Sequence, residues 1–120
     1  MKHMKNQTLL ARTANALAGL RHAVVSEHSL RFQLLVFTLV LLALAIVRPG
    51  AVWTALVLLA SGAVLAAELF NTALEALADL LHPEQHPQIK IVKDCAAAAV
   101  LIASLAAVGV GVALAIHLIA

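Results

Sequence analysis

Hydrophobic residues along the chain fall into four blocks, and the first differs from the rest in its spacing. From about Thr8 to Glu27 the apolar side chains recur at intervals of three and four, which places them on one face of a helix. Polar side chains occupy the opposite face. The apolar positions are Leu10, Ala14, Leu17, Leu20 and Val24, and the polar positions are Arg12, Asn15, His22 and Ser26. The pattern therefore predicts an amphipathic helix over about residues 8–27.

The next two blocks are continuous apolar runs joined by a short turn. The first covers about residues 30–47, carries no charge after Arg31, and stops at Pro49-Gly50, a strong turn signal. The second covers residues 51–81 without a proline and is far longer than the roughly 20 residues that cross a hydrocarbon core. Both are predicted to be membrane-spanning helices, and the second must extend out of the bilayer at one end.

A polar loop and a third apolar run complete the chain. The loop is predicted over about residues 82–91, because Pro83 and Pro87 interrupt helical hydrogen bonding. The third membrane-spanning helix is predicted from about Asp94 to Ala120.

Composition supports a membrane protein over a water-soluble or nucleic-acid-binding one. Apolar residues make up 63% of the chain and charged residues 12%, against about 45–50% and about 25% in soluble domains. A chain of 120 residues cannot hide so much apolar surface from water. Few aromatic residues (3%) and a net charge of +2 do not indicate a nucleic-acid partner. We expect one all-α integral membrane domain over residues 1–120.

Basic residues predict the orientation of the spans. Most of them precede the first span, namely Lys2, Lys5, Arg12, Arg21 and Arg31. Arg48 stands alone in the first connection, whereas Lys90 and Lys93 lie near the second. The positive-inside rule then places the N-terminus and the second loop in the cytoplasm. Four basic residues favour an anionic membrane surface, rather than a partner protein, as the place where the first helix lies: Lys2, Lys5, Arg12 and Arg21.

Polar side chains gather toward the end of the second span. Glu68, Asn71, Glu75 and Asp79 follow the helical repeat, so they form one stripe near the cytoplasmic edge of the bilayer. A charge at membrane depth costs roughly 3 kcal/mol, and like charges along a stripe repel one another. The stripe therefore predicts a compensating divalent cation, helped by Lys93. The alternative, a solvated polar face, suits Asp79 better than Glu68, whose neighbours in the sequence are apolar.

The stripe is part of a longer motif. Residues 68–79, ELFNTALEALAD, resemble the signature of the prokaryotic diacylglycerol kinase family, which includes undecaprenol kinases. Residues 19–21 (GLR) followed by Glu27 resemble the N-terminal pattern of that family. The pair at 93–94 (KD) with residues 98–101 (AAVL) resembles the opening of its third span.

The resemblance covers about residues 15–107 and implies a homotrimer whose active sites, shared between neighbouring protomers, face the cytoplasm. It also implies a role for each matching residue. Glu68 matches the catalytic base, Glu27 and Glu75 match metal-coordinating carboxylates, and the residues placed around the nucleotide and the reacting centre are matched by Asn71, Asp79, Lys93 and Asp94. ATP would be the co-substrate and magnesium the cofactor, in the cytoplasmic membrane of a bacterium.

The chemistry of these residue types agrees with that implication. Phosphoryl transfer depends on positioning and on neutralising phosphate charge, and magnesium commonly takes one or two carboxylates plus phosphate oxygens. The chain contains neither the G-x-x-x-x-G-K-[ST] phosphate loop nor the protein-kinase motifs. A kinase without these motifs is of another type, and the resemblance implies a lipid kinase that transfers the ATP γ-phosphate to diacylglycerol and gives phosphatidic acid.

Three alternatives are open at this point. Undecaprenol could be the lipid substrate instead of diacylglycerol. A small proton or cation conductor could line its pore with the residues from Glu68 to Asp79, and it would transport ions without ATP. A structural membrane subunit could use Glu68 and Lys93 only as an ion pair between helices. His82 and His86 flank a proline and are expected to be solvated loop residues rather than a zinc site.

Overall fold

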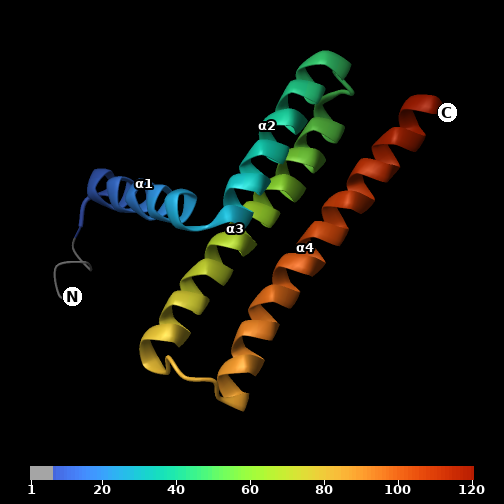
Figure 1. The fold of residues 1–120 in the computed structure, drawn as a ribbon. Coiled ribbons are helices and arrows are strands. Elements are labelled where there is room, and N and C mark those ends of the chain that lie inside the picture. The colour runs from blue at the N-terminus through green and yellow to red at the C-terminus, as the bar shows by residue number, and fades with distance from the viewer. Residues whose placement is uncertain (1–6) are drawn as a thin grey trace.

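The computed structural model describes residues 7–120, which form four helices and no strand (Figure 1). The helices are α1 (Leu9–Ser26), α2 (His28–Val47), α3 (Ala51–Leu81) and α4 (Pro87–Ile119). The last three are each long and apolar enough to cross a membrane. Lys2 and Lys5 lie outside the described residues. The all-α class and the three candidate spans predicted from the sequence are confirmed.

α1 is a separate helix that runs across the direction of the other three (Figure 1). It begins near the predicted position, where the Thr8 hydroxyl accepts a hydrogen bond from the Ala11 backbone N–H at 3.2 Å. A side-chain oxygen there satisfies one of the free N–H groups of the first turn. Ala23 is its one buried residue, so little of α1 is covered by the rest of the chain. That α1 lies on a membrane surface stays a prediction, as does the orientation of the spans.

A sharp corner between α1 and α2 positions Glu27. The backbone is extended at this residue, with φ −115° and ψ 115°, so Glu27 alone separates the two helices. The Arg31 guanidinium reaches back from α2, and its Nη1 atom donates to the carbonyl oxygens of Val24 and Val25, both at 2.9 Å. Carbonyl groups in the last turn of a helix lack helical partners, and basic side chains commonly satisfy them. Arg31 therefore fixes the direction in which α1 leaves α2.

Replacing Arg31 by alanine is expected to loosen this corner. The last carbonyl groups of α1 lose their donor, so amide hydrogen exchange over residues 23–27 should become about fivefold faster, while α3 and α4 exchange as before. The matched control is Arg12→Ala, which removes the same side chain from an exposed position of α1. Equal exchange rates in the two variants would show that Arg31 does not hold the corner.

The turn between α2 and α3 follows the sequence signal at Pro49-Gly50. Arg48 ends α2 in a left-handed conformation, at φ 50° and ψ 62°. Gly50 has φ 105°, which glycine adopts readily because it has no Cβ atom. α3 starts at the next residue, so the predicted turn is confirmed.

The connection between α3 and α4 is shorter than predicted. Pro87 does not interrupt helical structure; it is the first residue of α4. Proline suits this position because its missing N–H would have no helical partner in any case. His86 caps the helix, since its Nδ1 atom accepts a hydrogen bond at 3.1 Å from the backbone N–H two residues further on. The predicted loop over residues 82–91 is therefore wrong at its second boundary. The non-helical part of this connection is residues 82–86, and α4 begins seven residues before Asp94.

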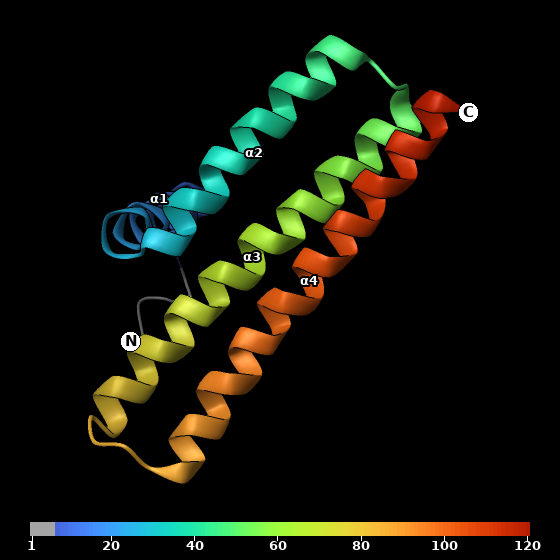
Figure 2. The same ribbon diagram turned by 45° about the vertical axis from the view of Figure 1, so that its right-hand side comes forward.

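α3 is the element that joins the fold together. α4 packs antiparallel along α3, whereas α2 contacts α3 but not α4 within residues 7–120 (Figure 1, Figure 2). At about 1.5 Å per residue, the 31 residues of α3 span about 46 Å, against about 30 Å for the 20 residues of α2. The second half of α3 therefore continues past the α1–α2 corner, as Figure 2 shows. This geometry agrees with a helix that extends beyond one side of a bilayer.

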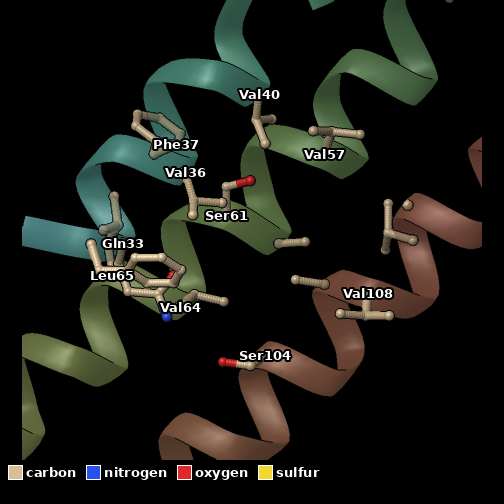
Figure 3. Close-up of a pocket in the computed structure, with 15 residues that line it drawn as sticks. Gln33, Val36, Phe37, Val40, Val57, Ser61, Val64, Leu65, Ser104 and Val108 are labelled. Atoms are coloured by element: carbon tan, nitrogen blue, oxygen red, sulfur yellow. The ribbon is translucent and has the colours of Figure 1, made fainter. Parts of the chain in front are cut away.

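An apolar groove lies between α2 and α4, with α3 as its floor (Figure 3). Its volume is about 350 Å³, and most of its lining side chains are apolar. The polar exceptions are Gln33, Ser61 and Ser104. The groove reaches Val64 and Leu65 on α3, about one helical turn before Glu68. An apolar surface thus leads toward the carboxylate that the sequence singles out.

Candidate active site

Among residues 7–120, Glu68 alone combines a charged side chain with burial, and only 5% of its surface is exposed. It projects from α3 toward the start of α2. There the Ser29 hydroxyl donates a hydrogen bond to Glu68 Oε2 at 3.2 Å. A buried carboxylate must be compensated by hydrogen bonds or opposite charge. Glu68 is thus no solvated surface residue, in agreement with its interpretation from the sequence.

Asn71 and Glu75 form the next polar pair along α3. The Asn71 Nδ2 atom donates to Glu75 Oε1 at 3.5 Å, which is a long contact. The Asn71 Oδ1 atom is buried and has no hydrogen-bond partner within residues 7–120. Such groups are rare in folded proteins because a lost hydrogen bond is costly. A group from outside these residues is therefore expected to meet this oxygen.

Two ion pairs lie at the ends of α3 and α4 that the short loop joins. Lys93 Nζ donates to Asp79 Oδ1 at 2.6 Å, and Lys90 Nζ donates to Asp94 Oδ2 at 2.6 Å. Lys93 precedes the apolar part of α4, and its hydrogen bond to Asp79 raises the pKa of Lys93 above the usual value. Lys93 thus pairs with Asp79 and not with Glu68, so the contact on which the structural-subunit alternative depends does not form in this chain.

A cavity of about 650 Å³ adjoins both ion pairs. It is bounded by loop 82–86 and by the neighbouring ends of α3 and α4. Its lining includes three of the four residues predicted to surround the nucleotide, Asp79, Lys93 and Asp94. Asn71, the fourth, lies outside this cavity, nearer to Glu68. His82 and His86 also line it, and their rings meet edge to face with centroids 5.1 Å apart.

Glu27 makes no side-chain hydrogen bond or ion pair with the other predicted site residues within residues 7–120. It is half-buried at the α1–α2 corner, and within residues 7–120 no hydrogen bond joins it to Glu68 or Glu75. In the same part of the chain, no three His, Cys, Asp or Glu side chains gather closely enough to hold a metal ion. Magnesium usually takes only one or two carboxylates and prefers oxygen ligands. Glu27, Glu75 and the unpartnered Asn71 oxygen supply such atoms, so the residues present fit this ion.

Ser29 is the site residue that sequence reasoning missed. A single serine in the first turn of a helix belongs to no spacing pattern, and its contact with Glu68 joins residues 39 positions apart. The one available signal was its place two residues after Glu27, at the corner that brings α1 and α2 to α3. That signal depends on the fold.

Comparisons with known proteins identify the family of this chain. The sequence model of the prokaryotic diacylglycerol kinase family matches residues 14–115, a range that includes every predicted site residue. A diacylglycerol kinase from a Synechocystis species is 38% identical over 104 residues, which cover 86% of this chain. The chain spans 59% of the length of that relative. Since the family model matches far more than half of the sequence, this chain belongs to the prokaryotic diacylglycerol kinase family.

Proposed function

We propose that this protein transfers the γ-phosphate of ATP to the hydroxyl group of diacylglycerol, giving phosphatidic acid, at the cytoplasmic face of a bacterial cytoplasmic membrane. The observation that carries the proposal is the buried Glu68 carboxylate. It lies between an apolar groove and a stripe of polar residues on α3 that leads to the Asp79–Lys93 pair. A reaction between a lipid alcohol and a nucleotide needs two such adjoining surfaces, one apolar and one charged. Family membership supports the same activity.

Glu68 acts as the general base in this proposal. Its Oε2 atom is engaged by Ser29, while Oε1 has no hydrogen-bond partner within residues 7–120 and is free to accept one from the lipid hydroxyl. The proton passes to the carboxylate as the hydroxyl oxygen attacks the γ-phosphorus, and the bond to the β–γ bridging oxygen breaks to release ADP. The groove ends about one helical turn from Glu68, so acyl chains lying in it would bring the hydroxyl to the carboxylate.

The nucleotide occupies the cavity beside the two ion pairs in this proposal. Lys93 is partly exposed, at 38% of its side chain, and can offset phosphate charge without leaving Asp79. Asp94 is held by Lys90, which lies one helical turn earlier on the same face of α4. Phosphoryl transfer depends chiefly on charge neutralisation and alignment. The neighbouring ends of α3 and α4 supply positive charge for the phosphates and a fixed position for it.

Glu27 and Glu75 would hold a magnesium ion, which neutralises phosphate charge when bound. Neighbouring side chains act on each position separately. Asn71 donates to Glu75 at 3.5 Å, and Arg31 fixes the corner from which Glu27 projects. We also propose the homotrimer that the family resemblance implies. The unpartnered Asn71 oxygen and the largely uncovered spans support a site completed by a neighbouring copy.

The test offers diacylglycerol and undecaprenol side by side to the purified protein in lipid vesicles, with labelled ATP and magnesium. Labelled phosphate on diacylglycerol is the expected result. Label on undecaprenol alone would reassign the substrate, and label on neither lipid would overturn the kinase proposal. Ion flux across the same vesicles without ATP would favour the conductor instead. Native mass spectrometry of the same preparation should show three copies, and a monomer would overturn the trimer.

A further inference from the structure

We propose that Ser29 is a positioning residue for the reaction, holding the Glu68 carboxylate in one orientation through the hydrogen bond between α2 and α3. The inference rests on the proposed function, because it gives Ser29 a role only if Glu68 takes the proton of the lipid hydroxyl. Neither the family match nor the motif around residues 68–79 assigns a role to this serine.

The contact made by the Ser29 hydroxyl differs from those of four other helical hydroxyl groups. Thr13, Ser26, Thr38 and Thr72 each donate to the backbone carbonyl four residues earlier in their own helix. That is the common local bond of a helical serine or threonine. Ser29 instead donates to a carboxylate on another helix, 39 residues away in the sequence.

The α1–α2 corner explains why this hydroxyl is free to cross to α3. The chain is extended at Glu27, so the carbonyl four residues before Ser29 belongs to the last turn of α1 and not to the helix that contains Ser29. The carbonyl that occupies that sequence position, at Val25, accepts from Arg31 instead. With no local acceptor, Ser29 can reach Glu68. The break that positions Glu27 therefore also frees the hydroxyl that binds the base.

The hydrogen bond has two consequences for a general base. It is the only side-chain hydrogen bond that Glu68 makes within residues 7–120, so it selects one carboxylate orientation from the rotamers that a long side chain can adopt. It engages Oε2 and leaves Oε1 for the substrate.

The test compares Ser29→Ala, Ser29→Thr and the control Ser26→Ala. All three replace a serine at the same corner, but the Ser26 hydroxyl bonds only to the His22 carbonyl. Ser29→Ala should lower kcat for diacylglycerol about tenfold, as expected for a lost hydrogen bond to a charged group, with KM for ATP changed less than twofold. Ser29→Thr should restore at least half of the wild-type kcat, and Ser26→Ala should match the wild type.

Several outcomes would overturn the inference. They are an unchanged kcat in Ser29→Ala, a rise in KM for ATP in place of the fall in kcat, equal losses in Ser29→Ala and Ser26→Ala, and no recovery in Ser29→Thr. None of these outcomes contradicts the proposed function, because each is measured against a wild-type protein that phosphorylates lipid. A wild-type protein that phosphorylates no lipid would instead overturn the proposed function, and this inference with it.

Discussion

Glu68→Gln is expected to lower kcat for lipid phosphorylation by about 10²–10⁴-fold, the usual contribution of a general base. Glutamine has nearly the size of glutamate, and its amide oxygen can still accept from Ser29. The amide cannot take a proton at neutral pH, so the variant keeps the shape of the site and loses its base. The measurement is kcat with labelled ATP and diacylglycerol, and KM for ATP should change by no more than about twofold.

Two further variants sharpen this result. Glu68→Asp keeps a carboxylate but draws it back by one methylene, so its kcat should lie between those of the wild type and Glu68→Gln. His117→Gln is the control far from the site, because His117 lies in the last turn of α4. There its imidazole contacts Trp53 at the start of α3, with ring centroids 5.3 Å apart. It should keep full activity. Wild-type activity in Glu68→Gln would remove Glu68 as the base.

The helices could be predicted because each depends on local signals. Long apolar runs fixed the three candidate spans, and Pro49-Gly50 fixed the first turn. Pro87 could not be placed by the same reasoning, because a proline blocks a helix from within and yet is favoured at its first position. The N-cap contact of His86 decides between these two cases, and a cap contact is visible only once the backbone is known.

The same distinction applies to the site. Glu68 and Asn71 could be placed on one stripe because a continuous helix fixes their relative positions. Contacts between helices depend on how those helices pack, which spacing does not encode. Lys93 was predicted to help the stripe as a whole, and its partner proved to be Asp79. The donor to Glu68, Ser29, was not predicted at all.

The polar contacts of the site also bear on how the helices associate. Apolar side chains gain little by leaving lipid for another helix, so membrane helices rely on close packing and on hydrogen bonds between them. The Ser29–Glu68 bond joins α2 to α3, and the Asp79–Lys93 bond joins α3 to α4. A substitution at either contact can therefore lower activity through chemistry or through helix association, and an experiment must separate the two.

Lys93→Met is expected to lower kcat/KM for ATP on the order of 10²-fold, as when a single group that stabilises transition-state charge is removed. Methionine keeps most of the apolar side-chain length but cannot offset phosphate charge. Lys90→Met is the comparison, because it removes the same charge from a position about one helical turn earlier. Lys90 forms an ion pair with Asp94, and the two side chains are 76% and 63% exposed. Exposed pairs of this kind contribute little, so its loss should stay below about threefold.

Asp79→Asn separates phosphate binding by Lys93 from helix association. It breaks the α3–α4 ion pair but leaves the Lys93 ammonium available to the nucleotide. If Lys93 acts on phosphate, Asp79→Asn should keep clearly more activity than Lys93→Met, while both variants show the same thermal stability in detergent.

Equal losses in Lys93→Met and Asp79→Asn would mean that the pair matters for joining the helices. Equal losses in Lys93→Met and Lys90→Met would mean that only the net positive charge of the cavity matters, because the two lysines line the same cavity and differ in their partners.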